Sequence, residues 1–568
     1  MPVTSPPLVS QPATPTSDID RAIADLQIGA RRLIAATLDE RINCVADCID
    51  GVATVARDWV EAACRAKRIP PSSAARAEEV LVGPVAVVRY LQLIKRTLQE
   101  LRSRGVPRLP GRVRVVGERV CAPTFPTRSL YDAIAFRSIT AVTWLEPGVP
   151  AARPFGDAPD RLARRIAPPP RIAAVLGAGN VSSIPATDVL TSILQNDCAV
   201  LLKMNPVNEY LGPFFERALA PLVRAGMLRI VYGGPEVGSY AVQHHAVDAV
   251  HVTGSIETHD AIVWGADADQ RRQRKQQGRP LLSKPVTSEL GNVTPWAIVP
   301  GDYSDAQLMS QAENIAASIA NNASFNCIAT KLLITWRRWP QRQRFLDLVE
   351  SILNAIPRRY AYYPGAAERY VEFAGGQAQA DDQGRLTWLL RRDVDPHQSP
   401  RLLDTESFVC VTGEVALQAD SPRDFLHRAV EFMNEQLWGT LAAAVTIPDQ
   451  MRTGEGPAVH AALRRLRYGT IGVNLWPGVA YALMSPPWGA YPGADLANVQ
   501  SGRGRVHNTY LLDRPEQTIL QAPLAMFPKP MWFSTHRRPE SLAWRLLRLY
   551  CRPALRKLPR LLGEAIRG

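Results

Sequence analysis

Three residues of this chain have side chains that together can do chemistry on a carbonyl group. Cys327 lies in Asn-Ala-Ser-Phe-Asn-Cys, Glu289 lies upstream in Ser-Glu-Leu-Gly, and Asn180 lies further upstream in a glycine-bearing turn. A thiolate attacks a carbonyl carbon, a carboxamide N–H stabilises the oxyanion that forms, and a carboxylate activates water as a general base. In this order the three residues predict covalent chemistry at the thiol, followed by hydrolysis.

Residues between Asn180 and Glu289 suit the binding of a dinucleotide. Lys203 ends an apolar stretch, Gly234 and Gly238 belong to a Gly-Gly-Pro-Glu-Val-Gly turn, and Gly254 and Ser255 follow another apolar stretch. Free backbone amides at a helix N-terminus, together with the helix dipole, favour a bound phosphate. We therefore expect the pyrophosphate of a dinucleotide near the Gly254–Ser255 turn.

Each of these residues also has an ordinary structural interpretation. Asn180 could end a strand-to-helix turn, Lys203 could be an edge lysine with its amine in water, and Glu289 could be a surface residue. A single cysteine such as Cys327 is most often a buried, inert residue. The chemical interpretation is favoured because all four occur together in one order.

The order and spacing of these residues resemble the aldehyde dehydrogenase superfamily over about residues 20–522. The resemblance implies that Cys327 is the nucleophile, that the Asn180 amide donates to the oxyanion, and that Glu289 activates the hydrolytic water. The enzyme would then oxidise an aldehyde to a carboxylic acid through a thiohemiacetal and a thioester.

The same resemblance assigns the cofactor, NAD or NADP. It implies that Lys203 contacts the adenosine ribose, that the Gly234–Gly238 turn lies near the adenine, and that the Gly254–Ser255 amides hold the pyrophosphate. Glu406 and Phe408, in Glu-Ser-Phe, match the pair that binds the nicotinamide ribose and ring. A homodimer or homotetramer is the assembly that the resemblance implies.

Several positions depart from the family pattern. Ser324-Phe325-Asn326-Cys327 stands where the family has Gly-Gln-x-Cys, so Phe325 replaces the glutamine; Asn292 and His259 replace glycines, and Pro206 replaces an acid that contacts the adenosine ribose. An alternative function is therefore a weakly active or inactive binding protein with this fold, at a membrane surface. An acylating, coenzyme A-dependent dehydrogenase is a third alternative, although such relatives generally lack the glutamate of Glu-Leu-Gly.

Apolar stretches alternate with helical patterns on both sides of residue 290, which predicts an α/β fold with parallel sheets. The resemblance adds a Rossmann-type cofactor domain, an α/β catalytic domain and a small β element for oligomerisation. We expect these parts at 18–110 with 168–289, at 290–499, and at 111–167 with 500–522. Residues 1–17 are expected to be a disordered lead, and the basic insertion 266–281 a solvated loop.

Composition limits the setting of the chain. Its 568 residues are 46% hydrophobic, and the eight cysteines are scattered, so we expect a reduced, cytoplasmic environment. No apolar run reaches the roughly 18 residues of a membrane-spanning helix. The net charge of +13 comes without a nucleic-acid recognition motif, so we expect no nucleic-acid partner.

Two segments bear on the substrate and on partners. Aromatic and apolar residues between 475 and 493 favour a long-chain or aromatic aldehyde. The basic extension 523–568 contains a predicted amphipathic helix over Glu540–Arg552. Two interpretations of this helix stay open: peripheral contact with an anionic membrane, and packing against a partner subunit.

Overall fold

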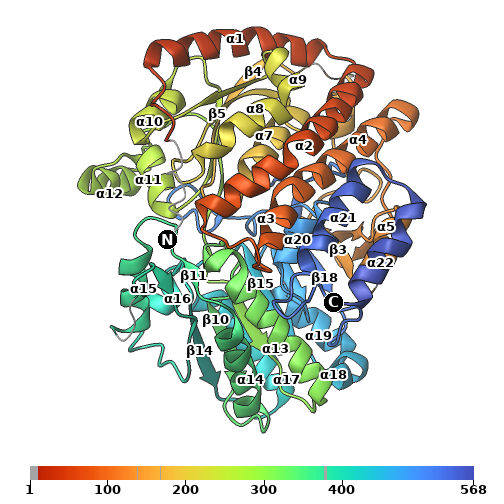
Figure 1. Cartoon of the computed structure of the whole chain (residues 1–568), viewed down its shortest axis with the longest axis vertical. Helices are drawn as coiled ribbons and strands as arrows, with labels where there is room; N and C mark the ends of the chain where they lie inside the picture. The colour runs from red at the N-terminus through yellow and green to blue at the C-terminus, as the bar shows by residue number, and fades with distance from the viewer. Residues whose placement is uncertain (1–9, 137, 165, 167, 377–379) are drawn as a thin grey trace.

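Two β-sheets with helices on their faces form the molecule (Figure 1). The structure is a computed structural model, and it describes residues 10–136, 138–164, 166, 168–376 and 380–568. The first helices lie with a six-stranded sheet in one half, and a ten-stranded sheet occupies the other half.

The six-stranded sheet has the order β17-β8-β7-β4-β5-β6 and is parallel except at β17. Its strands are β4 (Arg171–Leu176), β5 (Cys198–Lys203), β6 (Leu228–Val231), β7 (Ala249–Thr253), β8 (Val286–Glu289) and β17 (Gly502–Arg503). Ile172 and Ala174 of β4 pack with the buried side of α1 (Thr16–Ala35), whereas Val175 packs with α7 (Ile184–Leu194). Both faces of the sheet are therefore covered, as its apolar strands require.

Most of the chain from Thr16 to Arg104 is helical, with interruptions. After α1, the chain forms α2 (Leu38–Ala66), α3 (Arg76–Val80), a π-helical turn and α4 (Ala86–Arg104). Smaller helices complete this half: η2 (Glu209–Leu211), α8 (Gly212–Ala218), α9 (Ala220–Arg224), α10 (Pro235–Gln243) and α11 (Ile256–Trp264).

The ten-stranded sheet has the order β1-β2-β3-β18-β16-β15-β9-β10-β14-β13. Its strands are β1 (Arg114–Val116), β2 (Arg119–Phe125), β3 (Thr140–Leu145), β9 (Pro295–Ile298), β10 (Leu332–Trp336), β13 (Leu389–Arg391), β14 (Val411–Leu417), β15 (Ala442–Thr446), β16 (Thr470–Val473) and β18 (Pro515–Gln521). The strands of the expected small β element, β1 to β3 and β18, continue this sheet through the β18–β16 pair. Its main helices are α13 (Asp305–Ala320), α14 (Arg342–Ala355) and α17 (Pro422–Glu435).

Shorter elements connect these parts. They are α5 (Leu130–Ala135), α6 (Ala158–Leu162), β11 (Arg359–Tyr360), α15 (Ala366–Ala374), β12 (Arg385–Leu386), α16 (Arg401–Asp404), α18 (Asp449–Gly454), α19 (Gly456–Arg465) and α20 (Gly478–Leu483). The chain from Asn508 to Leu512 forms a turn. The Asn508 side chain bonds both the N–H and the carbonyl of Leu512, at 2.9 and 2.7 Å, which bends the chain before β18.

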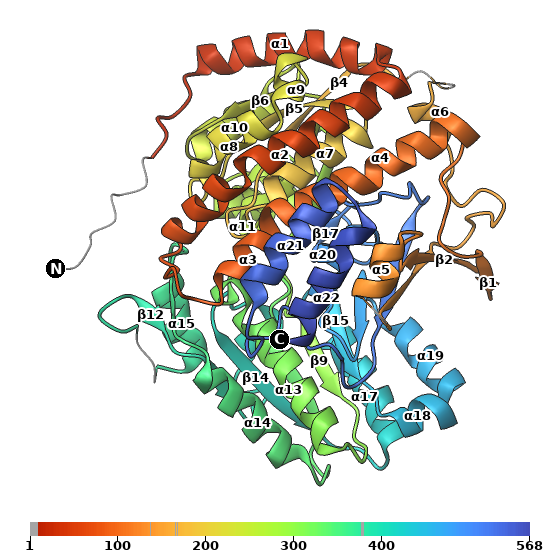
Figure 2. The ribbon, with the colours of Figure 1, turned by 45° about the vertical axis from the view of Figure 1, so that its right-hand side comes forward.

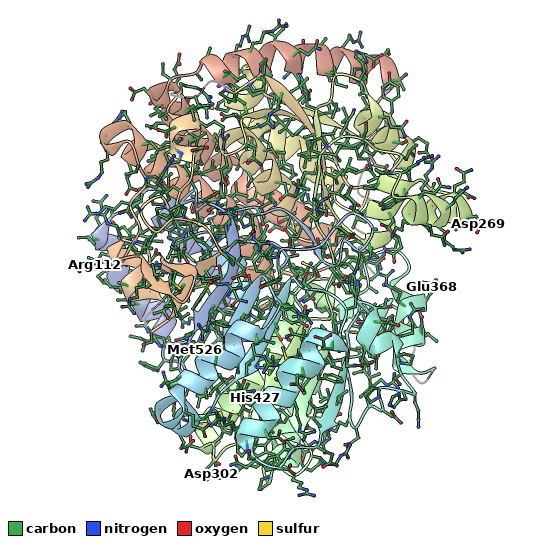
Figure 3. The ribbon with its side chains drawn as sticks, turned by 180° about the vertical axis from the view of Figure 1, so that it is seen from behind. Arg112, Asp269, Asp302, Glu368, His427 and Met526 are labelled. Carbon is green, nitrogen blue, oxygen red and sulfur yellow. The ribbon has the colours of Figure 1, made fainter. Side chains whose placement is uncertain are left out.

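The basic insertion 266–281 is a helix and not the expected loop. The helix α12 (Ala268–Gln277) begins where the Asp267 side chain accepts a hydrogen bond from the Gln270 N–H, and it ends at Gly278 in the left-handed region. These two caps stop a run of good helix formers. None of its residues is buried, and Asp269 projects into solvent (Figure 3).

Part of the expected disordered lead, residues 1–9, lies outside the described residues. The next residues contact the half of the molecule that holds the six-stranded sheet: the Ser10 hydroxyl and the Gln11 N–H donate to the carboxylate of Glu209 in η2 at 2.8 and 3.0 Å. The Thr14 N–H donates to the Tyr232 carbonyl at 2.9 Å, and α1 already begins at Thr16.

The C-terminal extension packs on its own chain. The helix expected over Glu540–Arg552 is confirmed as α21 (Pro539–Cys551), followed by η4 (Leu555–Lys557) and α22 (Leu558–Ile566). The apolar face of α21, including Leu542 and Leu549, is buried, and α21 lies against α2, α3 and α4 (Figure 2). The face that the membrane interpretation requires is thus already covered. In the described part of the chain, no helix combines the length and apolarity needed to cross a membrane.

Replacing Leu549 with alanine should lower the free energy of unfolding by about 2–5 kcal/mol, because this fully buried side chain would leave a cavity. Leu555→Ala is the matched control, since Leu555 is 57% exposed in the same extension and should change stability by about 0.5 kcal/mol or less. Urea denaturation measures both. Equal stability of the two variants would mean that α21 does not pack on the body of the protein.

Candidate active site

The predicted site residues gather at one edge of the six-stranded sheet. Glu289 is the last residue of β8 and Lys203 the last residue of β5, while Asn180 follows β4 and Gly254 follows β7. Because these strands are parallel, their carboxyl ends lie at one edge, where ligands bind in open α/β sheets. Cys327 comes from the other half of the molecule, after α13.

The loop that presents Cys327 has an unusual backbone. Asn322, Ala323 and Ser324 have φ values of +54°, +55° and +69°, in the left-handed region that glycine favours. Such residues cost on the order of 1–3 kcal/mol each and persist only where neighbours hold them. Ser324 stands where the family pattern has glycine. This substitution therefore places a side chain at a position whose backbone conformation favours glycine.

Lys331, which the sequence analysis missed, holds this strained loop. Its buried amine donates to the carbonyl of Ser324 at 3.0 Å, to the Ser324 hydroxyl at 2.7 Å and to the carbonyl of Val409 at 2.7 Å. Burial lowers the pKa of Lys331 to about 8, and the nearby Glu406 carboxylate opposes this shift. Lys331 thus ties the Cys327 loop to the segment that follows Phe408.

Two carboxamides hold the backbone just before Cys327. The Asn180 and Asn322 side chains both donate to the carbonyl of Phe325, at 3.1 and 2.8 Å. Lys67, also missed from the sequence, donates to the Asn180 carbonyl at 3.1 Å and to the Asn322 side chain at 2.8 Å, and it pairs with buried Glu79 at 2.7 Å. Asn180 therefore lies beside the Cys327 loop with one of its two amide N–H groups engaged.

The thiol and the carboxylate face one another. Cys327 Sγ lies 4.0 Å from Glu289 Oε1, and the Trp488 indole N–H donates to the same oxygen at 2.8 Å. Burial raises the pKa of Glu289 to about 7, with a further contribution from Asp188, while the Trp488 hydrogen bond opposes the shift. Burial and the Glu289 charge raise the pKa of Cys327 well above its usual range. At neutral pH the resting pair is a thiol beside a partly ionised carboxylate.

A buried polar group lies behind Glu289. Thr253 donates to the Asp188 carboxylate at 2.8 Å, and His251 Nε2 lies 3.5 Å from the same carboxylate. Burial lowers the pKa of His251, but the charge and hydrogen bond of Asp188 together with the Glu289 charge outweigh burial, so the pKa is raised. The negative charge of Asp188 therefore contributes to the high pKa of Glu289.

The candidate cofactor residues lie along the same edge. Gly234 precedes the first turn of α10 and Gly238 lies within it, whereas Gly254 and Ser255 are exposed at the start of α11. A Cβ at Gly254 would meet open space, so the approach to this helix end is free. The Ser255 hydroxyl accepts from the Thr258 N–H at 3.2 Å. Burial lowers the pKa of Lys203, although Glu209 and Glu236 oppose the shift.

Glu406 and Phe408 lie beside the Cys327 loop. Glu406 Oε1 is buried and has no hydrogen-bond partner among the described residues, and burial raises the pKa of Glu406 to about 8. The Phe408 ring lies 5.0 Å from that of Tyr363 and 5.9 Å from that of Phe325. The unsatisfied oxygen and the free N-terminus of α11 fit a dinucleotide, whose ribose hydroxyl and pyrophosphate would satisfy them.

The other departures from the family pattern leave this edge open. The His259 ring is fully buried in α11, so it does not cover the exposed start of that helix. The Asn292 amide donates to the carbonyl of Ala442 at 2.6 Å and to the hydroxyl of Thr294 at 3.0 Å. Pro206 is exposed at the end of β5.

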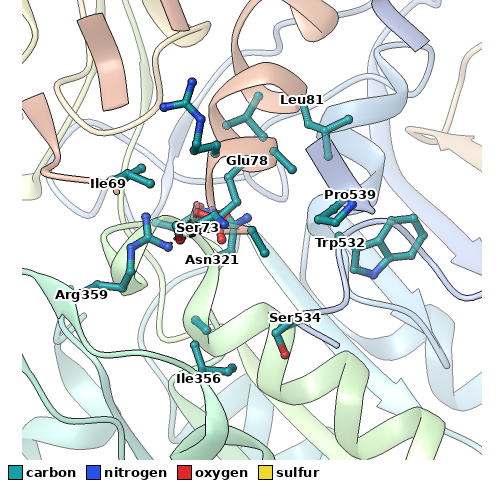
Figure 4. A pocket seen from close by; sticks show the side chains of 18 of the residues that line it. Ile69, Ser73, Glu78, Leu81, Asn321, Ile356, Arg359, Trp532, Ser534 and Pro539 are labelled. Carbon is teal, nitrogen blue, oxygen red and sulfur yellow. Dashed lines mark hydrogen bonds and ion pairs between the residues drawn. The ribbon is translucent and has the colours of Figure 1, made fainter. Parts of the chain in front are cut away.

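Cys327 and Glu289 line a cavity of about 2020 Å³, and Figure 4 shows part of the wall of this cavity. Near the thiol its walls include Ile328, Trp476 and Trp488. Of the ten predicted site residues, Cys327 and Glu289 line this cavity, and the other eight do not. The cavity therefore gives a substrate access to the thiol and the carboxylate, while the sheet edge stays free for a second ligand.

Comparison with known proteins agrees with this geometry. Residues 178–352 match the model of the aldehyde dehydrogenase family. No curated protein matches the chain. Among solved structures, the NAD-dependent aldehyde dehydrogenase from Sinorhizobium meliloti is 16% identical, with a TM-score of 0.57 over 89% of this chain and 87% of that one.

Two further solved structures share the fold. Lactaldehyde dehydrogenase from Escherichia coli is 14% identical, with a TM-score of 0.57 over 90% of this chain and 91% of that one. The glyceraldehyde-3-phosphate dehydrogenase GapN from Methanocaldococcus jannaschii, complexed with NADP, is 13% identical, with a TM-score of 0.57 over 90% of this chain and 96% of that one. The predicted fold class is confirmed: residues 178–352 match the aldehyde dehydrogenase family model, and the chain as a whole shares the fold of solved aldehyde dehydrogenases.

Proposed function

We propose that this protein oxidises an aldehyde to a carboxylic acid with NAD or NADP, using Cys327 as nucleophile. The observation that carries the proposal is the 4.0 Å approach of the Cys327 thiol to the Glu289 carboxylate in the lining of a large cavity. The unsatisfied Glu406 oxygen and the open start of α11 support a bound dinucleotide. Matched solved proteins include an NAD-dependent enzyme and an NADP complex.

The first step needs a base for the thiol. Because the pKa of Cys327 is raised and that of Glu289 is about 7, Glu289 is the facing group that can take the proton. The sulfur then bonds to the carbonyl carbon and gives a thiohemiacetal oxyanion. The second Asn180 amide N–H and the Cys327 backbone N–H are suited to stabilise this oxyanion, by about 3 kcal/mol per donor.

The later steps use the same carboxylate. When bound, the dinucleotide supplies a hydride acceptor for the oxidation. Glu406 and Phe408 would hold its nicotinamide end, and Lys203 with the start of α11 would hold its adenosine and phosphate groups. Water then attacks the Cys327 thioester while Glu289 takes a proton from it, which releases the carboxylic acid and restores the thiol. A protonated Glu289 could perform neither transfer, so its pKa of about 7 sets the pH dependence.

Cys327→Ala should abolish aldehyde oxidation while leaving the melting temperature close to that of the wild type. The partly buried sulfur makes no strong hydrogen bond that the fold would lose, since its contacts with Glu289 and Asn326 are 4.0 and 3.9 Å. Cys551→Ala is the matched control and should keep full turnover. The assay is cofactor reduction at 340 nm with a panel of aldehydes, and wild-type turnover by Cys327→Ala would refute the assignment.

Glu289→Gln should slow the steady-state rate by about 10² to 10⁴, because thioester hydrolysis loses its general base. Glutamine can still accept the Trp488 hydrogen bond, so the site should keep its shape. A burst of reduced cofactor, slower than in the wild type because Glu289 also serves the thiol, followed by still slower turnover is the expected stopped-flow trace. In the wild type the rate should rise with pH and reach half its maximum near pH 7, as Glu289 ionises. A variant that loses the burst as completely as the steady state would limit Glu289 to activation of the thiol.

NADP should be tolerated, with a slight preference for NAD. The exposed Pro206 replaces an acid that would repel the 2′-phosphate of NADP. No arginine that would bind this phosphate was identified from the sequence, so NAD keeps a slight advantage. Calorimetric dissociation constants for the two cofactors measure the preference. A difference above about tenfold, or 1.4 kcal/mol, would contradict this prediction.

A further inference from the structure

The C-terminal extension, which lies beyond the region of family resemblance, forms part of the cavity that leads to Cys327. The wall segment, residues 531–550, contributes Met531, Trp532, Phe533, Ser534, Thr535, Pro539, Leu546 and Tyr550 to the lining. Figure 4 shows Trp532 and Pro539 on one side of the cavity, and Ile69 and Arg359 on the other. Residues more than 200 positions from Cys327 in the sequence thus border the same space.

Polar contacts fasten the wall segment to the helix that precedes Cys327. Thr535 Oγ1 and Lys529 Nζ donate to Glu313 of α13 at 2.5 and 3.0 Å. The Trp532 indole N–H approaches Asn314 Oδ1 of the same helix at 3.5 Å. These contacts hold Trp532 against the helix that leads into the nucleophile loop.

The other end of the wall segment is fastened to the N-terminal helices. Arg76 of α3 pairs with Glu540 at 3.3 Å and with Glu61 at 2.6 Å. The Gln92 side chain donates to the Tyr550 carbonyl at 2.8 Å, and the buried face of α21 packs on α2 to α4. Both ends are held within one chain, so the wall segment is a fixed wall.

Size and lining indicate the substrate class. A cavity of about 2020 Å³ exceeds the roughly 300–1,000 Å³ of ordinary small-molecule sites, so a short aldehyde would leave most of it empty. Its lining beyond the thiol is mainly apolar and includes Val181, Leu81, Phe136, Leu546 and Trp532. A long alkyl chain extending from the reacting carbonyl would displace water from these surfaces, gaining about 0.8 kcal/mol per buried CH₂.

We propose that the wall segment determines substrate specificity, and that the protein acts on long-chain aliphatic aldehydes whose distal carbons contact Trp532. This inference rests on the proposed aldehyde oxidation for its catalytic readout. The role of the wall segment is to bind an alkyl chain. Measuring the binding of a long-chain ligand without turnover therefore tests this role separately from catalysis.

The test compares Trp532→Ala with three reference proteins: the wild type, the conservative Trp532→Phe, and Trp544→Ala. Trp544 lies in the same segment and is not among the residues that line the cavity. Kinetics with butanal and dodecanal give the ratio of kcat/KM values, and calorimetry with dodecanoate and butyrate gives binding without turnover. Melting temperatures check that each variant folds.

Dodecanal should be preferred over butanal by the wild type, and Trp532→Ala should reduce that preference about tenfold through a higher KM for dodecanal. Affinity for dodecanoate should fall with it, while kcat/KM for butanal stays within about twofold. Trp532→Phe should restore most of the preference, and Trp544→Ala should leave it unchanged.

Three results would overturn the proposal: no dodecanoate binding by the wild type, equal binding by Trp532→Ala and the wild type, or an equal loss in Trp544→Ala. If dodecanoate binds through Trp532 but no aldehyde is oxidised, the proposed alkyl-chain site is supported and the proposed oxidation is refuted. If aldehydes are oxidised without regard to chain length, the oxidation is supported and the role of the wall segment is refuted.

Discussion

The left-handed backbone from Asn322 to Ser324 is the constraint on which the geometry at Cys327 depends. Three consecutive non-glycine residues in this region are costly, and the loop keeps its shape because buried groups fill its hydrogen-bonding capacity. Lys331 donates to the carbonyl and hydroxyl oxygens of Ser324, and two asparagine amides donate to the carbonyl of Phe325. The substitution of serine for glycine thus brings a hydroxyl that the buried lysine uses.

The same burial that holds the loop sets the electrostatics of the site. Lys67 and Lys331 are both buried, and each has a carboxylate nearby, Glu79 at 2.7 Å in the first case and Glu406 in the second. Glu406 has a pKa raised to about 8 and Lys331 a pKa lowered to about 8, so each shifts towards its neutral form. Removing one member of such a pair leaves the other without compensation, which costs about 3–5 kcal/mol.

Local sequence pattern and chain order predicted the helices, the strands and the candidate catalytic residues. They predicted less well the residues that hydrogen-bond to the site and hold it in place. Glu289 and Cys327 were predicted from residue type and order, and the strands that position them followed from apolar alternation. Lys67 and Lys331 were missed, and Trp488 was predicted only as part of the aromatic stretch 475–493, because their hydrogen bonds join residues far apart in the sequence, as in the 199 positions between Trp488 and Glu289. The helix α12 was missed because its sequence is polar and basic and has no apolar periodicity. Its capping residues are the only sequence signal of a helix there.

The extension after residue 522 shows why an amphipathic pattern alone does not identify a partner. The apolar stripe of α21 predicts that something covers it, and a membrane, a second subunit and the same chain satisfy that requirement equally. Topology decides between them. β18 lies between β3 and β16, and the chain leaves it beside α13, where Gln311 donates to the Leu524 carbonyl at 2.7 Å. Because α13 also leads into the Cys327 loop, an extension that continues from this point and packs back on α2 to α4 has to pass the opening beside the nucleophile.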